Sequence, residues 1–379
     1  MGAGIQGFNG ERLTQAREAR GFTQAALASQ LKVTRAAVSQ YESRQRTPSS
    51  EILIRLSHAL GMPTHFFVQK DSFEIKNAVF FRSMASATKA IRTQAKRRYE
   101  WLACVVNYLR MYIDFPGVEI PTFDVPDNPK RLSFSDIEHI AESTRSKMGL
   151  GFGPISNVTW LLENRGAIIG QLDLHSKTLD AFSNWCDETP FLILNKKKGS
   201  AVRWRYDLAH ELGHMILHRQ VNEHKLADQA MFKLIEDQAH YFAGAFLLPE
   251  STFGATIPYS VTLDTLLAIK AKWRVSLAAM IMRLKNLELI SDKKGQRLFV
   301  SISRRKWRTH EPLDDELEFE EPHLLRRAIE LLVEENVLRL RDIEASLGIP
   351  KEEIENLIGY REPETENIIK LSHIKYNSP

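Results

Sequence analysis

Apolar residues recur at every third or fourth position along most of this chain, which predicts a protein built mainly from α-helices. The first such stretch, residues 8–68, alternates short helical segments with tight turns. Leu13 and Ala16 mark the inner face of its first helix, and Val38 and Tyr41 mark that of its third. Threonines precede the second and third helices at N-cap positions. We therefore expect a five-helix unit at the N-terminus.

Two short apolar runs in the middle of the chain break this helical period. Residues 167–172 and 190–194 are rich in Ile and Leu, and each has the length of a strand. Helical periods precede them, at residues 135–148 and 158–162, and another follows them, at 208–218. We expect a small sheet beside these helices. Such a sheet could hold an extended peptide by strand addition.

Shifts in composition divide the chain into four parts. Four prolines between residues 116 and 129 punctuate an extended linker, so we place a domain boundary near residue 130. A helical connector and linker, 69–130, then separates the N-terminal unit (8–68) from an α+β domain at 131–300. A cluster of acidic residues follows that domain and introduces a helical C-terminal region, 301–379.

Overall composition narrows the class of protein. The net charge is only +4, so any affinity for nucleic acid must come from a local patch. Residues 82–98, with six Lys or Arg and no acidic residue, are either such a patch or a solvated helix face. Two cysteines exclude a disulfide framework. With no secretory signal and no apolar stretch of spanning length, we expect a cytoplasmic protein without a membrane partner.

Residues 208–218 carry the strongest candidate for chemistry. They contain no proline and predict one helix, on which His210 and His214 share a face because they are four positions apart. Glu211 then lies at the edge of the site between the two imidazoles. This H-E-x-x-H spacing supplies two nitrogen ligands for zinc and a carboxylate placed as general base. The alternative is a helix with two partly buried histidines that only form hydrogen bonds.

A catalytic zinc needs a third protein ligand and an open position for water. Residues 234–249 are helical in period and place Glu236 and His240 on the same face, four positions apart. We assign Glu236 as the third ligand and His240 as a second polar group that orients a ligand. The reverse assignment, with His240 as the ligand, stays open.

The third N-terminal helix leaves a polar face on its outer side. The side chains on this face suit hydrogen bonding to base edges in a major groove: Arg35, Ala36, Ser39 and Gln40. Arg44, just beyond the helix, is placed for a backbone phosphate. A small helical bundle used for protein contacts is the alternative.

The N-terminal unit resembles the Cro/CI-type (Xre) helix-turn-helix repressors over its full length. The matching residues are Leu13, Arg17, Thr23, Gln24, Leu27, Ala28, Val33, Thr34, Val38, Ser39, Tyr41, Glu42, Pro48, Leu56, Ala59 and Leu60. The resemblance implies an operator of double-stranded DNA and a homodimer on two half-sites. We expect the DNA contacts to come from Gln24, Thr34, Arg35, Ala36, Ser39, Gln40 and Arg44. Lys32 departs from the family, in which many members carry glycine, and this changes the turn rather than the mode of docking.

The α+β domain is similar to the ImmA/IrrE family of zinc metallopeptidases, which have a zincin-like HExxH fold. The similarity covers residues 200–209 before the motif and, after it, Glu236, Ala239, Phe242, Ala243 and Leu247–Pro249. It implies that Zn²⁺ is held by His210, His214 and Glu236, with Glu211 as the base. His218 also matches, with no ligand role implied. His240 departs from the asparagine or aspartate of many members.

We therefore expect a DNA-binding transcriptional regulator that carries a zinc-dependent endopeptidase. By resemblance, its substrate would be a repressor or another partner protein in a prophage or stress response. The rival hypothesis is a transcription regulator or antitoxin whose peptidase-like domain is a non-catalytic sensor or scaffold. The complete set of ligands with Glu211 favours a working site, because a scaffold has no need of Glu211.

Overall fold

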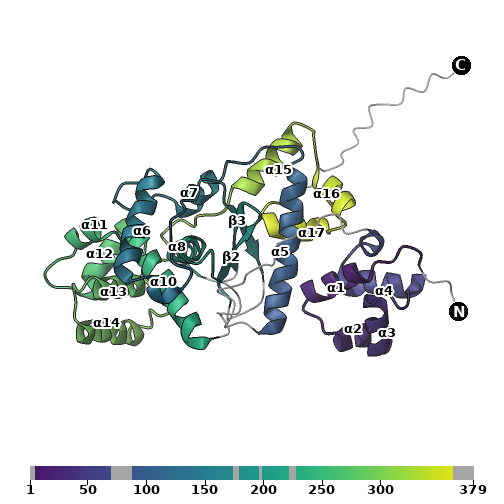
Figure 1. Ribbon diagram of the computed structural model, residues 1–379, viewed down its shortest axis with the longest axis horizontal. Helices are drawn as coiled ribbons and strands as arrows, with labels where there is room; N and C mark the ends of the chain where they lie inside the picture. The colour runs from purple at the N-terminus through teal and green to yellow at the C-terminus, as the bar shows by residue number, and fades with distance from the viewer. Residues whose placement is uncertain (1–4, 70–87, 174–178, 196–198, 222–227, 362–379) are drawn as a thin grey trace, which may run out of the picture.

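The structure is a computed structural model that describes residues 5–69, 88–173, 179–195, 199–221 and 228–361. The described part is mainly helical, with one small sheet near its middle (Figure 1). The predicted fold class is therefore confirmed: an N-terminal helical unit, an α+β region and a helical C-terminal region. None of the helices in these ranges is long and apolar enough to cross a membrane.

The N-terminal unit consists of four α-helices and a closing 3₁₀ helix. They are α1 (Gly10–Ala19), α2 (Gln24–Leu31), α3 (Arg35–Glu42), α4 (Ser50–Leu60) and η1 (Thr64–Val68). Thr23 and Thr34 cap α2 and α3 as predicted, each hydroxyl accepting a backbone N–H three residues on. Val38 and Tyr41 are buried, as predicted. Lys32 ends α2 in the left-handed region, at φ 54°, where glycine meets no steric penalty.

A long helix, α5 (Lys89–Leu109), runs beside the N-terminal unit (Figure 1). It carries most of the predicted basic run, of which residues 82–87 lie outside the described residues. Arg97 from this run forms ion pairs with Glu18 of α1 and with Glu100, both at 2.8 Å. At least this cation therefore serves packing within the protein. The C-terminal half of α5 is buried in a core shared with α1, the sheet and the C-terminal helices.

The sheet has three strands, β1 (Ile168–Leu172), β2 (Ala181–Cys186) and β3 (Thr189–Asn195). Their order is β1-β3-β2, so the central β3 pairs in parallel with β1 and antiparallel with β2. The two predicted apolar runs form β1 and β3, whereas β2 was not predicted. Because side chains alternate across a strand, the sheet serves two cores. Ile168 and Phe191 face the core with α5, and Ile169 and Leu192 face the other.

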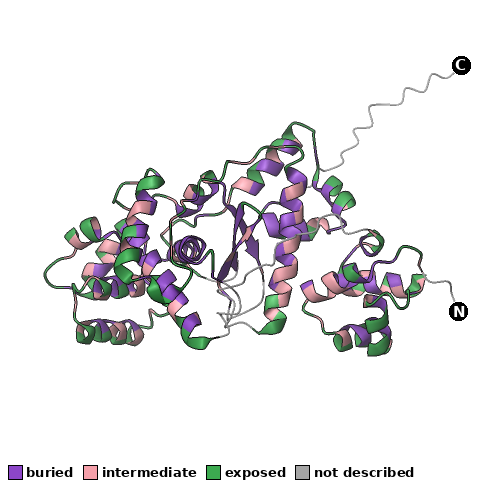
Figure 2. Cartoon of the chain, viewed as in Figure 1, coloured by how far each residue is buried: buried purple, intermediate pink, exposed green. Residues whose placement is uncertain are grey.

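Helices of the α+β region build this second core. They are α6 (Phe134–Lys147), α7 (Val158–Asn164), α8 (Ala201–Leu217), α10 (Gln229–Leu247), α11 (Glu250–Ala255), α12 (Leu263–Trp273), α13 (Leu277–Asn286) and α14 (Asp292–Arg304). Thr262 and Ser276 cap α12 and α13, each accepting a backbone N–H three residues on. Figure 2 shows α8 end on and coloured as buried, between the sheet and its neighbouring helices, and most of its residues are buried.

The C-terminal region comprises α15 (Leu324–Glu334), α16 (Leu340–Leu347) and α17 (Lys351–Ile358), which pack against α5 and, for α15 and α17, also against β1. Buried Glu353 of α17 accepts hydrogen bonds from Arg20 of α1 at 2.6 Å and from Arg98 of α5 at 2.9 Å. Arg98 also donates to the carbonyl of Asp173, directly after β1, at 2.6 Å. This junction connects the N-terminal unit to the sheet.

The acidic segment before α15 packs on the α+β region through buried ion pairs. Lys270 of α12 lies 2.8 Å from a carboxylate oxygen of Glu311 and 2.6 Å from one of Asp314. Farther along, Glu320 pairs with buried Arg205 of α8. These carboxylates therefore serve internal packing.

Candidate metal centre

The H-E-x-x-H residues lie on α8, a helix with 14 buried residues among its 17. Helix α10 packs directly along it. Gly213 makes this close approach possible, because a Cβ atom there would lie 3.0 Å from the ring of Phe242 on α10 and 3.3 Å from the carbonyl oxygen of Ala239. The absence of a side chain within the motif thus sets the spacing between the two helices.

Three polar side chains from α8 and α10 meet at one point. The Nε2 atoms of His210 and His214 lie 3.0 Å apart. One oxygen of Glu236 lies 3.4 Å from the first Nε2, and its other oxygen lies 3.2 Å from the second. These are the three residues whose ligand atoms are close enough together to hold one metal ion. The structure therefore brings together the three side chains that the sequence suggested as ligands.

The separations match a tetrahedral zinc site. Ligand bonds of about 2.0–2.1 Å at tetrahedral angles place ligand atoms roughly 3.3 Å from one another. The two Nε2 atoms lie 3.0 Å apart, and their distances to Glu236 are 3.4 Å and 3.2 Å, each to a different carboxylate oxygen, so all three distances are near that value. In addition, Oε1 of Glu236 is buried and accepts no hydrogen bond from the described residues. A buried acceptor that lacks a proton donor suits a cation.

A chain of hydrogen bonds reaches His214 at Nδ1, the ring nitrogen that faces away from His210 and Glu236. The amide nitrogen of Gln238, on α10, donates to the carbonyl oxygens of Pro129 at 2.8 Å and Leu132 at 3.1 Å. Its oxygen therefore faces His218 and accepts from Nε2 of that ring at 3.1 Å. A neutral imidazole carries one proton, so a His218 ring that donates from Nε2 accepts at Nδ1. That Nδ1 atom lies 3.1 Å from Nδ1 of His214.

This chain determines which nitrogen of His214 carries the proton. With Nδ1 donating to His218, the lone pair of His214 lies on Nε2 and points toward His210 and Glu236. A histidine that ligates a metal has this form, and its other ring nitrogen donates to a supporting group. His218 and Gln238 were not assigned roles from the sequence. The i, i+4 spacing of His214 and His218 was a signal that could have identified the first of them.

Glu211 lies between α8 and the sheet and is almost fully buried, with 1% of its surface exposed. Its Oε2 accepts a hydrogen bond from the hydroxyl of Ser183, on β2, at 2.7 Å. The carboxylate is thereby held in one orientation next to His210. Because β2 was missed in the sequence, this partner of Glu211 was missed as well.

His240 lies beside the three converging residues, on the open side of the site. Its ring is 4.3 Å from that of His210, centre to centre, and its Nδ1 is 3.3 Å from the hydroxyl of Tyr206. Desolvation, and then the neighbouring His210, lower the pKa of His240 to about 4, although part of the ring reaches solvent. His240 is therefore neutral near pH 7. The supporting hydrogen bond expected from it is made instead by His218, to His214.

The charge of Glu236 also suits a ligand. Burial alone raises the pKa of this carboxyl, but its close contacts with the rings of His210 and His214 outweigh burial and lower the pKa well below its usual range. Glu236 therefore stays ionised at neutral pH. An ionised carboxylate is the form that binds a metal.

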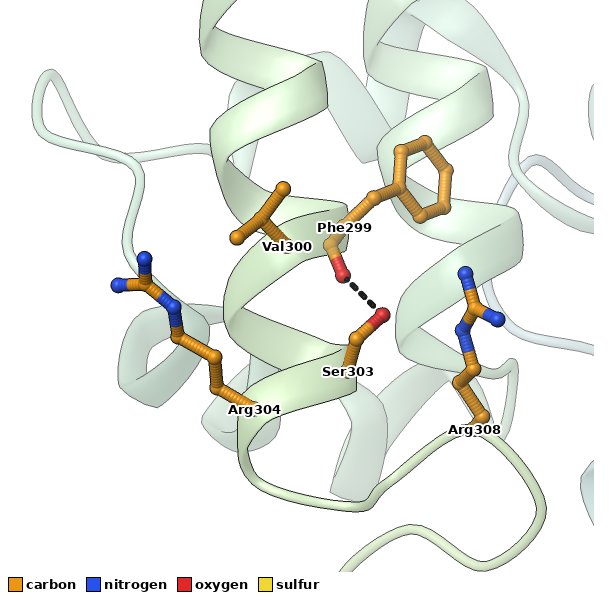
Figure 3. A pocket seen from close by; sticks show the side chains of 5 residues that line it. All are labelled: Phe299, Val300, Ser303, Arg304 and Arg308. Atoms are coloured by element: carbon orange, nitrogen blue, oxygen red, sulfur yellow. Dashed lines mark hydrogen bonds between the residues drawn. The ribbon is translucent and has the colours of Figure 1, made fainter.

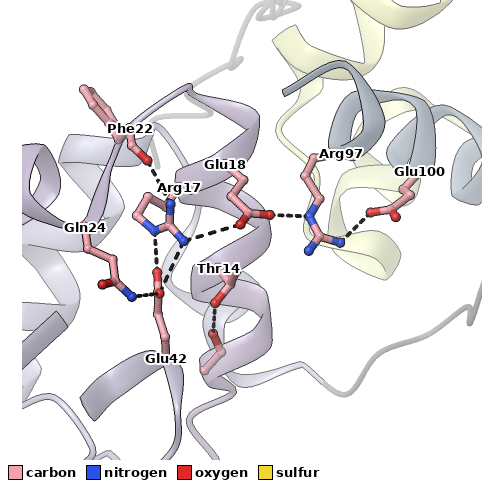
Figure 4. Close-up of polar contacts among 9 residues, drawn as sticks. Thr14, Arg17, Glu18, Phe22, Gln24, Glu42, Arg97 and Glu100 are labelled. Atoms are coloured by element: carbon pink, nitrogen blue, oxygen red, sulfur yellow. Dashed lines mark hydrogen bonds and ion pairs between the residues drawn. The ribbon is translucent and has the colours of Figure 1, made fainter. Parts of the chain in front are cut away.

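The polar face predicted on α3 is open. Arg35, Ala36, Ser39 and Gln40 are all exposed, whereas Thr34 is engaged as the cap of the helix. Gln24, at the start of α2, donates to Glu42 at 2.7 Å, and Arg17 donates to the same carboxylate at 2.5 Å (Figure 4). The hydrogen bond from Gln24 to Glu42 holds the start of α2 and the end of α3 together.

Arg44 follows α3 in the left-handed region, at φ 61°. Its guanidinium donates to the side chain of Asn9 at 2.8 Å, while 59% of the Arg44 side chain remains exposed. The guanidinium also lies 3.6 Å from a carboxylate oxygen of Glu11, so Arg44 is anchored beside the start of α1 while most of its side chain stays exposed.

Comparison with known proteins locates two family segments. Residues 13–67 match the helix-turn-helix family model, and residues 162–285 match the peptidase M78 model, described as an IrrE N-terminal-like domain. The chain is also 34% identical over 68 residues to the HTH-type transcriptional regulator ImmR of Bacillus subtilis (strain 168). That match covers 18% of this chain and 54% of the relative, so it spans about half of the relative's length. The converging residues of α8 and α10 lie within the second family segment.

Proposed function

Because the chain joins an Xre-type helix-turn-helix segment to an ImmA/IrrE-like peptidase segment, we propose that it is a DNA-binding transcriptional regulator with a zinc-dependent endopeptidase centre. The convergence of His210, His214 and Glu236 supports the second half of this proposal most directly. Two neutral imidazole nitrogens and one carboxylate form a donor set that catalytic zinc sites use, with a position left for water.

His210, His214 and Glu236 would hold the zinc ion. When bound, zinc would supply a Lewis acid that activates water and stabilises charge on a carbonyl oxygen. Glu211 would accept the proton of the attacking water and pass it to the nitrogen of the leaving chain. The hydrogen bond from Ser183 supports this role, because it fixes the orientation of a buried carboxylate that directly follows His210 in the chain.

The edge of the sheet offers a place for the substrate. In the described sheet, β2 pairs with β3 on one side, and its other edge is not paired with a strand. An extended peptide added along that edge would pass close to Ser183 and Glu211. We propose that the substrate is a segment of a protein, either a repressor or another partner, bound in this extended form.

The exposed face of α3 supports the DNA-binding half of the proposal. We propose that Arg35, Ser39 and Gln40 reach base edges in the major groove, with Gln24, Thr34, Ala36 and Arg44 completing the contact surface. A homodimer on two half-sites would follow from this mode of docking. Replacing Arg35 with alanine removes the one cation at the start of α3 without touching the core.

Two measurements test the two halves separately. Metal analysis of purified protein should find about one zinc ion per chain in the wild type and in Glu211→Gln, and little in Glu236→Ala. Selection from a random duplex library should yield a preferred sequence for the wild type, and Arg35→Ala should lose that preference. Equal zinc content in all three proteins would contradict the metal site, and an unchanged preference in Arg35→Ala would contradict the DNA contact.

A further inference from the structure

Besides the basic run at residues 82–98, a second concentration of positive charge lies in the region that follows α13. Residues 292–308, which form α14 and the turn after it, contain seven Lys or Arg and one Asp, a net charge of +6. Since the whole chain carries +4, all other residues together carry −2. A local excess of this kind attracts polyanions even when the whole protein is nearly neutral.

The cations line up on the outer side of α14. Lys293, Arg297 and Arg304 are exposed and follow the i, i+4, i+11 spacing that keeps side chains on one helix face. Lys306 and Arg308, directly after the helix, continue the exposed set. The opposite face is apolar and packs into the core through Leu298 and Ile302. The basic side of α14 is therefore the side left to solvent.

These cations are not used inside the protein. Two other cations of this region form ion pairs: Arg305 lies 3.1 Å from Asp264, and Lys285 lies 2.9 Å from Asp292. By contrast, none of the described carboxylates lies within ion-pair distance of Lys293, Arg297, Arg304, Lys306 or Arg308. Five exposed cations thus repel one another on one short surface, without a neighbouring charge that offsets them.

A hollow of about 330 Å³ lies on the same surface, lined by Phe299, Val300, Ser303, Arg304 and Arg308. Figure 3 shows Arg304 and Arg308 on either side of the Ser303 hydroxyl, which donates to the carbonyl of Phe299 at 2.9 Å. The hollow has little exposed apolar surface, because Val300 is the one large apolar side chain in its lining that is exposed. The surface therefore favours a partner recognised mainly by negative charge.

We infer that the basic surface of α14 (Lys293, Arg297, Arg304, Lys306 and Arg308) binds the phosphodiester backbone of duplex DNA. The inference rests on the proposed DNA binding by α3 and adds a second, sequence-independent contact to it. Figure 1 shows α14 and α3 near the lower edge of the molecule, at its opposite ends, and each carries exposed polar or basic residues. Phosphates are contacted mainly by Arg and Lys, and such contacts position a protein without reading sequence.

The salt dependence of DNA binding tests this inference with the full-length protein. Fluorescence anisotropy with a duplex of random sequence would be recorded over a range of NaCl concentrations. Each phosphate contact contributes about 0.9 to the slope of log affinity against log salt. The double variant Arg297→Gln/Arg304→Gln should lower that slope by about 1.8 and weaken binding at 0.1 M salt by at least about tenfold. As a matched control, Lys233→Gln/Arg341→Gln removes two exposed cations from α10 and α16 and should leave the slope unchanged.

The possible outcomes separate the two proposals. If the wild type does not bind DNA at all, the proposed function fails together with the inference. If the wild type binds DNA and the α14 variant has the same slope as the control, only the inference is overturned. It is overturned equally if the α14 variant loses binding to polyglutamate but keeps its slope for DNA, because the surface would then belong to an acidic protein partner.

Discussion

The Nδ1 atoms of His214 and His218 lie 3.1 Å apart, and this contact presents the Nε2 atom of His214 to the candidate metal centre. Gln238 holds His218 in turn, and backbone carbonyls hold Gln238. The orientation of a ligand on α8 thus depends on the segment around Pro129, about eighty residues earlier in the chain. Supporting groups of this kind affect metal affinity without touching the metal.

Removing His218 should therefore weaken zinc binding. We expect His218→Ala to lower zinc affinity by about 10- to 100-fold, as measured by competition with a chelator. Gln238→Leu should have a smaller effect in the same direction, because His218 would keep its place but lose the group that orients it. His58→Ala, an exposed histidine on α4, serves as the control. Zinc affinity that is the same in all these variants would show that the chain of hydrogen bonds has no role in the site.

The spacing between α8 and α10 should be sensitive to one methyl group. In Gly213→Ala, the new Cβ atom would lie 3.0 Å from the ring of Phe242, so α10 would have to move and Glu236 with it. We expect a loss of about 1–3 kcal/mol in the free energy of unfolding, and weaker zinc binding. The matched control is Gly244→Ala on α10, where the nearest atom is 3.7 Å away. If both variants bind zinc as the wild type does, close helix packing does not position the ligands.

Buried Glu163 should make stability depend on pH. Burial raises the pKa of this carboxyl from 4.5 to about 7, even though hydrogen bonds from the backbone N–H groups of Leu324 and His323 act in the opposite direction. Between these pKa values the folded protein keeps a proton that the unfolded chain has released. The contribution of Glu163 to stability is therefore largest below pH 4.5 and is lost as the pH rises through 7.

Denaturant unfolding of the wild type and of Glu163→Gln would measure this effect. Glutamine keeps an acceptor for the backbone of α15 but does not titrate. The wild type should lose, relative to the variant, on the order of 3 kcal/mol between pH 4.5 and 7.5, with little further change above that. Parallel curves for the two proteins over the whole range would mean that Glu163 is not responsible.

Local signals in the sequence predicted most of the helices but only part of the sheet. Thr23 and Thr34 cap helices where the sequence indicated, because a cap depends on residues three positions apart. Strand β2 was missed because Ser183 and Asn184 interrupt its apolar pattern and its pairing with β3 compensates for them. Local patterns do not record such pairing.

In the candidate site, too, local spacing predicted some residues and missed those that the tertiary fold brings in. The spacing of His210 and His214 placed two imidazoles on one face, and the period of α10 selected Glu236 as a third group beside them. The partners Ser183 and Gln238 could not be found in this way. Ser183 reaches Glu211 from a strand 28 residues away, and Gln238 is held by a carbonyl 109 residues away. Such contacts follow from the tertiary fold alone.

Replacing Glu211 with glutamine tests whether the metal centre cleaves peptide bonds. Zinc-loaded wild type and zinc-loaded Glu211→Gln would each be incubated with a library of peptides derived from whole proteomes, and newly formed N-termini would be identified by mass spectrometry. We expect the wild type to produce specific cleavages and Glu211→Gln, with the same zinc content, to produce none. The same cleavages at the same rate by both proteins, or no cleavage by the zinc-loaded wild type in this library or in a co-expressed repressor, would contradict a peptidase centre built around Glu211.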